Sequence, residues 1–334
     1  LNRRLANVSA QQFPSENTPR YLILVASLVA VGLSLFQLWQ PLVGFVPVGS
    51  LPFESVLGQQ PATYFRPIHL CWVLVLGFLV YPLGREGGAA RWLDGAVIAL
   101  VLWASIRILI FDYQSIEHLL NGLRAADFIA GLVLVIATLE MARRAVGAVM
   151  MWVGLIFLLY AAFGNILPDL LATKGFSFER IIRFQVFTGA GLFGAPLGIA
   201  AGAVFSFVLF GAFLQVTGAG KFLIDLSFAA AGRYRGGPAK ASVIASAAMG
   251  SISGSAIANT VTTGSLTIPM MKKLGYKPEE AAGIEAAAST GGQIMPPIMG
   301  AGAFVMAEFT KTSYGDIVWM ALAPALLYFF SVLL

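Results

Sequence analysis

Charged residues are scarce in this sequence of 334 residues, because Asp, Glu, Lys and Arg together make up only 11% of it. Soluble domains carry about 25% charged residues on average, whereas 58% of this chain is hydrophobic. So few charges cannot cover a water-exposed surface. Several stretches of about twenty residues contain almost no ionisable group, and that length crosses the hydrocarbon core of a bilayer. The sequence therefore excludes an ordinary soluble protein and predicts an all-α integral membrane protein.

Cysteine and histidine are almost absent. The one cysteine, Cys71, lies in an apolar run and excludes a disulfide framework, and His69 and His118 have no neighbours at metal-ligand spacing. The net charge is +5, but Lys and Arg are spread over short loops, which excludes nucleic acid as a partner. Neither paired carboxylates nor a nucleophile with its base occur within the apolar segments. We therefore expect no enzyme, no structural zinc and no cofactor.

Long apolar runs predict the membrane spans. They lie at residues 21–40, 67–83, 93–111, 125–142, 147–167, 187–216, 280–309 and 317–334. Residues 219–232 predict a short amphipathic helix on the membrane surface. Lys and Arg are more frequent in the loops that lie inside when residues 1–20 form a cytoplasmic tail. The charge pattern therefore predicts a cytoplasmic N-terminus.

Residues 238–271 differ from these runs because they are small, apolar and rich in hydroxyl groups. The segment is too long for one span and too short for two spans of about twenty residues each. It therefore predicts a re-entrant helical hairpin, which enters and leaves the membrane on the same side.

Two segments predict non-helical backbone at membrane depth. In GSISGSAIANT, residues 250–260, glycines loosen the helix and Ser253, Ser255 and Asn259 supply side-chain oxygens. In STGGQIMPP, residues 289–297, the two prolines remove N–H donors and free carbonyl oxygens one turn earlier. Such backbone survives in a membrane only inside protein or beside a wet cavity. Neither break contains Asp or Glu, so the oxygens suit a monovalent ion such as Na⁺, and broken helices are typical of secondary-transporter sites.

These motifs carry a family resemblance. Residues 238–309, with GSISGSAIANT, KKLGYKPEEAAGIEAAAS and STGGQIMPPIMGAGAFVMAE, resemble the large membrane subunit of tripartite ATP-independent periplasmic (TRAP) transporters. The preceding spans are similar to the small subunit in the fused form that is paired with a TAXI-type periplasmic binding protein. The resemblance implies a four-helix scaffold domain at 21–144 and the first half of a transport domain at 145–334. Because the sequence has no initiator Met and ends in an apolar run, we expect it to be part of a longer chain with a second inverted repeat.

The resemblance also implies a mechanism and a site. Members of the family are elevator-type importers of the bacterial or archaeal inner membrane that couple the uptake of small organic anions, carboxylates or amino acids, to Na⁺. The Na⁺ is held between the hairpin tip and the break in the following helix. Transferred to this sequence, the ion-binding residues are Ser253, Gly254, Ser255, Asn259, Ser289, Thr290, Gly291, Gly292 and Pro296. The resemblance assigns no substrate-binding residue.

Other interpretations stay open at the level of sequence. A divalent-anion/Na⁺ symporter-type carboxylate transporter also has hairpins but uses no binding protein, and a non-transporting structural subunit would explain the first four spans alone. Small residues in membrane helices also serve close packing. Glu285 lies one turn before Ser289 and either tunes the ion site or is solvated or salt-bridged, whereas Arg107 predicts an ion pair within the scaffold.

Overall fold

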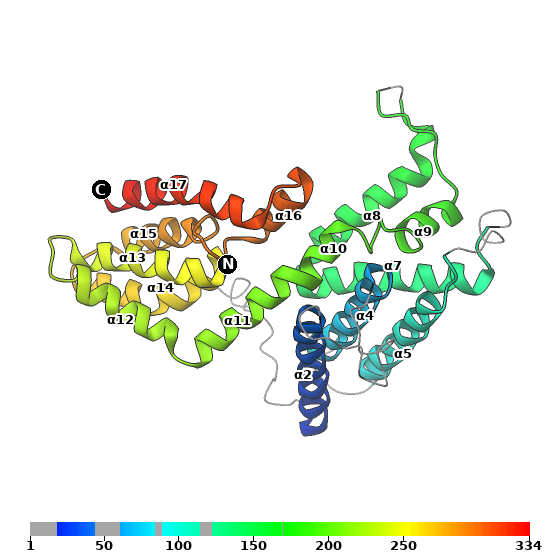
Figure 1. The fold of residues 1–334 in the computed structure, drawn as a ribbon, viewed down its shortest axis with the longest axis horizontal. Helices are drawn as coiled ribbons and strands as arrows, with labels where there is room; N and C mark the ends of the chain where they lie inside the picture. Colours follow the sequence, from blue (N-terminus) through cyan, green and yellow to red (C-terminus); the bar gives the residue numbers. More distant parts are fainter. Residues whose placement is uncertain (1–18, 44–60, 84–88, 114–121, 169) are drawn as a thin grey trace. The chain divides into compact units, whose positions relative to one another are not determined.

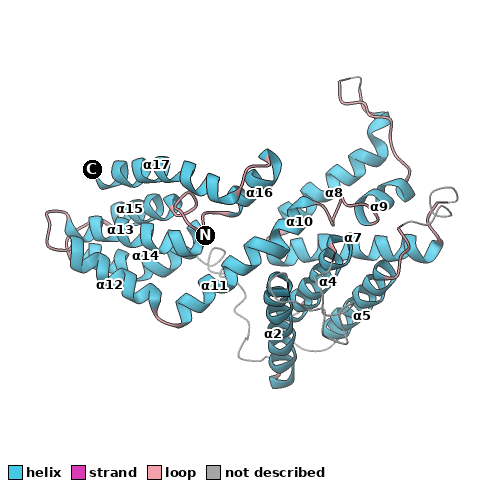
Figure 2. Cartoon of the chain, viewed as in Figure 1, coloured by secondary structure: helices cyan, strands magenta, loops and turns pink. Residues whose placement is uncertain are grey.

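The structure, a computed structural model, describes residues 19–43, 61–83, 89–113, 122–168 and 170–334. The regular elements among these residues are helices, and the described part of the chain contains no strand (Figure 2). The predicted all-α class is therefore confirmed. The predicted tail falls almost wholly outside the described residues, as does His118. The helices are α2 (Arg20–Val43), α4 (Ala62–Val80), α5 (Ala89–Leu109), α7 (Ala125–Ala145), α8 (Ala148–Phe163), α9 (Phe178–Val186), α10 (Ala195–Ile199), α11 (Phe205–Val216), α12 (Ala219–Ala231), α13 (Gly237–Ser253), α14 (Ala256–Lys273), α15 (Pro278–Gly291), α16 (Ala301–Thr310) and α17 (Tyr314–Leu333).

The chain forms two compact units, residues 1–201 and 202–334. In the first unit α4, α5 and α7 pack together, α2 packs on α4, and α8 and α9 pack on α7 (Figure 1). The apolar core of this unit includes Leu74, Phe78, Ile108 and Leu134, each almost fully buried. The predicted division between scaffold and transport domains at residue 144 rests on likeness to two separate subunits. The compact units are defined by packing alone, so the predicted division stays a prediction.

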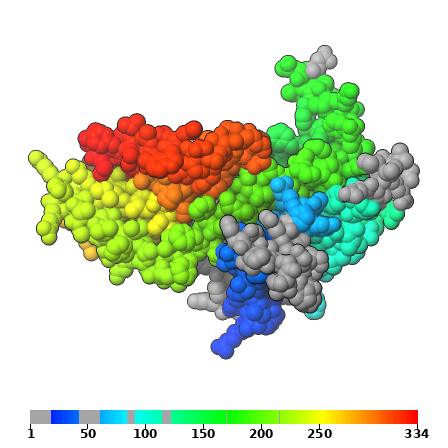
Figure 3. Space-filling model, viewed as in Figure 1, coloured from blue at the N-terminus to red at the C-terminus, as the bar shows by residue number. Residues whose placement is uncertain are grey.

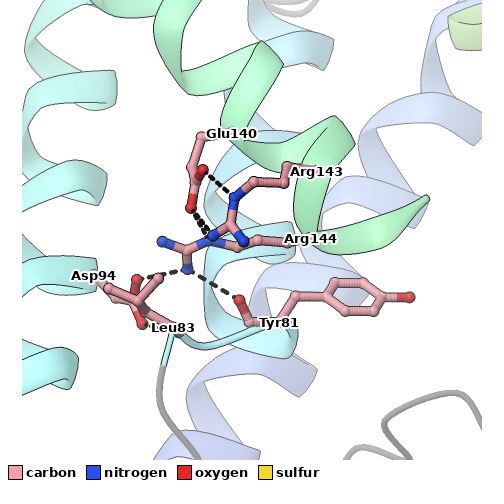
Figure 4. A network of polar contacts seen from close by, with 6 residues as sticks. All are labelled: Tyr81, Leu83, Asp94, Glu140, Arg143 and Arg144. Carbon is pink, nitrogen blue, oxygen red and sulfur yellow. Dashed lines mark hydrogen bonds and ion pairs between the residues drawn. The ribbon is translucent and has the colours of Figure 1, made fainter. Parts of the chain in front are cut away.

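A buried polar network joins three helices at one end of the first unit (Figure 4). Nη1 of Arg144 in α7 lies 2.6 Å from Oδ1 of Asp94 in α5 and donates to the carbonyl of Tyr81, which follows α4, at 3.0 Å. The other carboxylate oxygen of Asp94 accepts from the N–H of Leu83 at 2.9 Å, and Nε of Arg144 donates to Glu140 at 2.7 Å. The end of α4, the start of α5 and the end of α7 therefore share one end of the unit, as successive antiparallel spans require.

An ion pair joins α5 and α7 at their other ends, where Arg107 pairs with the buried carboxylate of Asp127. The predicted scaffold ion pair of Arg107 is therefore confirmed. Because both charges lie on apolar helices, each one satisfies the other where water is scarce.

Large apolar side chains remain exposed along several helices. α8 has no buried residue although it is strongly apolar, and Leu28, Phe157 and Trp319 are exposed on α2, α8 and α17. Surfaces of this kind are stable in lipid and unfavourable in water. Among the described residues seven helices are long and apolar enough to cross a membrane, namely Arg20–Leu42, Ala62–Val80, Arg91–Leu109, Ala125–Ala145, Ala148–Ile166, Ala195–Leu214 and Tyr314–Leu333.

The predicted span at 187–216 is wrong at its beginning. Residues 187–194 form turns, because the sequence GAGLFG there contains three glycines, and the apolar span begins only at Ala195. Before these turns lies α9, which the apolar runs of the sequence did not predict. Ser177 caps α9 by accepting from the N–H of Arg180 at 3.3 Å, and Ile181 and Val186 bury one face of the helix. The remaining predicted spans and the helix at 219–232 match helices, although 280–309 contains two.

The second unit is built around α13. Helices α12, α14, α15 and α17 all pack against α13, and α15 also packs against α14 and α17 (Figure 1). The red and orange atoms of α17 and α16 form one edge of this unit in the space-filling view (Figure 3). The segments with broken helices therefore lie in one body.

Candidate functional site

The segment 238–271 forms the predicted helical hairpin, with α13 and α14 packed side by side. Gly254 ends α13 with φ of 61°, a left-handed conformation that costs glycine little. Ser255 then starts α14, and its hydroxyl accepts from the N–H of Ala258 at 3.3 Å. The tip thus follows from one glycine and one capping serine. The insertion of this hairpin into the membrane from one side remains a prediction.

The predicted break in the following helix is also present. α15 begins at Pro278 and ends at Gly291, and α16 begins only at Ala301. Pro296 and Pro297, joined by a cis peptide bond, lie in the connecting loop, where neither residue can donate a backbone hydrogen bond. The hydroxyl of Tyr314 in α17 donates to the carbonyl of Pro297 at 2.7 Å and so fixes the loop to the next helix.

The hairpin tip packs against this loop. The N–H of Ile298 donates to the carbonyl of Ser251 at 3.2 Å. A methyl group at Gly254 would lie only 1.8 Å from the carbonyl oxygen of Met299, so the two backbones are in direct contact there. The two predicted breaks, about forty residues apart in sequence, therefore meet in space.

Deeper in the unit, α13 and α15 touch through two glycines. A methyl group at Gly250 would lie 2.3 Å from the Cα atom of Gly292, and one at Gly292 would lie 3.2 Å from Nδ2 of Asn259. Nδ2 of Asn259 donates to the carbonyl of Ser246 at 2.8 Å, which turns Oδ1 the other way. Oδ1 is buried and has no hydrogen-bond partner among the described residues. A buried amide oxygen without a partner is costly, which makes it a candidate ligand for a cation.

The structure brings together only part of the predicted ion-binding set. Ser253, Gly254, Ser255, Asn259 and Gly292 lie at the tip or at the contact of α13 with the end of α15, and Pro296 lies in the loop between α15 and α16. The other three predicted residues have different partners. The carbonyls of Ser289, Thr290 and Gly291 accept from the N–H groups of Gly292, Gln293 and Ile294 at 3.1–3.2 Å.

The hydroxyls of Ser289 and Thr290 and the Cα atom of Gly291 also face partners other than the hairpin tip. The hydroxyl of Thr290 is exposed and donates to the carbonyl of Ala286 at 2.7 Å. A methyl group at Gly291 would meet the ring of Tyr328 at 2.5 Å, so this glycine packs against α17. The hydroxyl of Ser289 donates to Glu285 at 2.9 Å. The hydroxyl and carbonyl oxygens of Ser289, Thr290 and Gly291 are therefore each hydrogen-bonded within α15 or the turn that follows it.

The surroundings of Glu285 differ from those expected of a solvated or a salt-bridged side chain. Its exposed fraction is 0%, and no ion pair among the described residues includes it, so the solvated and salt-bridged interpretations are both wrong. Instead the carboxylate accepts hydrogen bonds from five hydroxyl groups on three helices, those of Ser242, Ser246, Thr263, Thr267 and Ser289. We call Glu285 and these five residues the Glu285 cluster. The sequence contains a pattern that could have indicated these hydrogen bonds. The hydroxyl residues occur as pairs four residues apart in α13 and in α14, which places each pair on one face of its helix.

The chemistry of the site is that of neutral oxygens. No group of three or more His, Cys, Asp or Glu that could hold a metal occurs in the described part of the chain. Amide, carbonyl and hydroxyl oxygens instead surround the contact between the hairpin and the break. Broken helices whose ends meet in one apolar body define a class of protein, the secondary transporters with discontinuous membrane helices.

Comparison with known proteins gives the family within that class. The family model of the "Tripartite ATP-independent periplasmic transporter, DctM component" matches residues 132–334, more than half of the chain. The chain therefore belongs to the DctM family of TRAP transporter permeases, whose members are not enzymes. The resemblance seen in the sequence is confirmed for the large subunit, whereas the fusion to a small subunit remains a prediction.

Individual relatives agree with this membership. The C4-dicarboxylate TRAP transporter large permease protein DctM of Pseudomonas aeruginosa is 37% identical over 121 residues, which cover 36% of this chain and 28% of the relative. The protein of the same name in Vibrio cholerae is 36% identical over 124 residues, covering 36% and 26%. The 2,3-diketo-L-gulonate TRAP transporter large permease protein YiaN of Escherichia coli is 36% identical over 91 residues, covering 27% and 21%. The chain thus spans about a quarter of the length of the relatives it matches. No solved structure matches the chain.

Proposed function

We propose that this chain is part of a membrane permease that imports small organic carboxylates by Na⁺ symport. Family membership supports the permease role. The relatives named for C4-dicarboxylates and for 2,3-diketo-L-gulonate support a carboxylate as the substrate class. The helix ends at the break support an anionic substrate as well, because the positive end of a helix dipole favours negative charge.

We propose a Na⁺ site at the contact between the hairpin and the broken helix. The observation that carries this proposal is the buried Oδ1 of Asn259, which has no partner among the described residues and lies on an amide that touches Gly250 and Gly292. Carbonyl and hydroxyl oxygens of the tip, at Ser253, Gly254 and Ser255, and the carbonyls of the loop from Gly292 to Pro296 complete the donor set. The ion would bridge the hairpin to the break. Ser289, Thr290 and Gly291 stay a prediction, because the two hydroxyls face other partners while each carbonyl keeps a second lone pair beside its hydrogen bond.

The remaining features of the proposal follow the family. The hairpin and the broken helix would move together as a transport domain against a scaffold that includes the helices of residues 21–144. The substrate would arrive on a TAXI-type periplasmic binding protein. The permease would lie in the inner membrane of a bacterium or archaeon, with residues 1–20 in the cytoplasm.

Substrate uptake by proteoliposomes tests the proposal. The complete parent protein and its binding protein are assayed with a panel of organic acids, with Na⁺ or K⁺ outside, for the wild type, Asn259→Ala and the matched control Thr262→Val. Among the described residues the hydroxyl of Thr262 bonds only the carbonyl of Ala258 in its own helix, so this control should behave as the wild type does. We expect uptake that needs Na⁺ and that is lost in Asn259→Ala. Uptake that persists in K⁺, or in Asn259→Ala, would refute the Na⁺ site, and uptake without the binding protein would favour the symporter class that uses none.

A further inference from the structure

We infer that Glu285 is a positioning residue that orients Asn259 toward the proposed Na⁺. This inference rests on the proposed function, because it concerns the same ion. Among the described residues Glu285 has no hydrogen bond to the hairpin tip at Ser253, Gly254 and Ser255. It acts through Ser246 and Thr263, which belong to different helices and which both contact Asn259.

The first link runs through α13. Ser246 is fully buried, and its hydroxyl donates to Oε1 of Glu285 at 2.9 Å. The backbone carbonyl of the same residue accepts from Nδ2 of Asn259 at 2.8 Å. Since one residue makes both bonds, Glu285 helps to hold in place the turn of α13 whose carbonyl accepts from the Asn259 amide. That acceptor fixes which way the amide turns and leaves Oδ1 as the free end.

The second link runs through α14. The hydroxyl of Thr263 lies within hydrogen-bond distance of Oε1 of Glu285 and, at 2.8 Å, of the backbone carbonyl of Asn259 one turn earlier. Thr267 extends the contact by one further turn, because its hydroxyl donates to Oε2 at 2.6 Å. A methyl group at Gly264 would lie 3.0 Å from Cγ of Glu285, so α14 and α15 approach closely at this level. The carboxylate therefore holds the hairpin helix that carries Asn259 against α15.

A carboxylate is suited to this role and an amide is not. An ionised carboxylate only accepts hydrogen bonds and has about four lone-pair sites, so most of the five surrounding hydroxyls can donate to it at once. A glutamine at this position would present an NH₂ group to hydroxyls that now donate, so some of the five would have to turn away. Hydrogen bonds to a carboxylate are among the strong ones, so five of them favour one fixed arrangement of the three helices.

The test measures the apparent affinity for Na⁺ in two ways on the complete parent protein. The first is the rise in thermal unfolding temperature of the purified protein as Na⁺ replaces K⁺, and the second is uptake by proteoliposomes at increasing Na⁺. For Glu285→Gln we expect the Na⁺ concentration for half-maximal effect to rise about tenfold or more, as for other residues that orient a metal ligand. Maximal uptake at saturating Na⁺ should remain. The matched control is Glu280→Gln, on the same helix but exposed, which should leave the affinity for Na⁺ unchanged.

Two further variants keep the test independent of how well Glu285→Gln folds. Ser246→Ala removes the hydroxyl that bonds Glu285 but keeps the carbonyl that bonds Asn259, and Thr263→Val removes the second link. Each should raise the half-maximal Na⁺ concentration severalfold, whereas the exposed Ser265→Ala should not. A merely structural role predicts a lower unfolding temperature with unchanged apparent affinity for Na⁺, and that result overturns the inference. A wild type that shows no response to Na⁺ overturns the proposed function and this inference together.

Discussion

Gly250 and Gly292 mark the point where the backbones of α13 and α15 touch, and the space there excludes any side chain. A methyl group at Gly250 would lie 2.3 Å from the Cα atom of Gly292, which is backbone and cannot turn aside. We expect Gly250→Ala to lower the free energy of unfolding by about 1–3 kcal/mol, as overpacking of a tight contact does. Thermal unfolding of the purified parent protein measures the change.

The control for this prediction is the same substitution at Gly283. This glycine lies in α15, and apart from the backbone of its own helix no described atom lies within 4 Å of the position that a methyl group would take. Because alanine is favoured over glycine in a helix by about 0.5–1 kcal/mol, Gly283→Ala should raise the unfolding temperature or leave it unchanged. Equal losses of stability in both variants would contradict the close approach of α13 to α15.

At the residue scale the sequence predicts what depends on local backbone chemistry. The glycine of the tip, Gly254, and the prolines of the break, Pro296 and Pro297, were found because each changes the conformations that its own backbone can take. The role of Glu285 was not found, because its partners come from positions as far as 43 residues away. Only the packing of three helices decides which hydroxyls meet that carboxylate, and a single sequence does not record that packing.

At the scale of elements, the Arg144 network holds the ends of α4, α5 and α7 together (Figure 4). The side chains of Arg144 and Asp94 are only 7% and 8% exposed, so water cannot replace the interaction if one partner is removed. We expect Arg144→Ala to destabilise the protein by about 3–5 kcal/mol, because the substitution leaves a buried carboxylate without its counter-charge. Thermal unfolding again measures the change.

The neighbouring arginine supplies a matched control. Arg143 also pairs with Glu140, at 2.7 Å, but its side chain is 38% exposed and its ion pairs among the described residues include only that carboxylate. Exposed ion pairs contribute about 0–1 kcal/mol, so Arg143→Ala should have a small effect. Similar effects of the two substitutions would mean that the Asp94 contact does not hold the helix ends together.

The helices that were predicted correctly are those with long apolar runs. The apolar runs of α2, α5 and α7 are each about twenty residues, and their existence followed from composition alone. The nine-residue α9 was missed, because it alternates charged and apolar residues and adds no apolar run. Its capping serine at Ser177 and the period of its buried residues were the signals that could have revealed it.

At the scale of the whole molecule, the predicted orientation in the membrane follows from the distribution of Lys and Arg. With residues 1–20 in the cytoplasm, the loop between α8 and α9 lies outside and the turn between α12 and α13 lies inside. Leu170 in the first of these segments and Tyr234 in the second are both well exposed. They offer two positions for a test by cysteine labelling.

We expect these positions to respond differently to a membrane-impermeant maleimide. In a parent protein whose native cysteines, Cys71 among them, are replaced by Ala, a cysteine at Leu170 should react in intact cells whose outer membrane is permeable, because it faces the periplasm. A cysteine at Tyr234 should react only after the inner membrane is opened. The reverse pattern would mean that the orientation is inverted. If both cysteines react in intact cells, both positions face the periplasm, and the single crossing predicted between residues 170 and 234 is wrong. Since the hairpin begins at Gly237, shortly after Tyr234, this result also decides from which side of the membrane the hairpin enters.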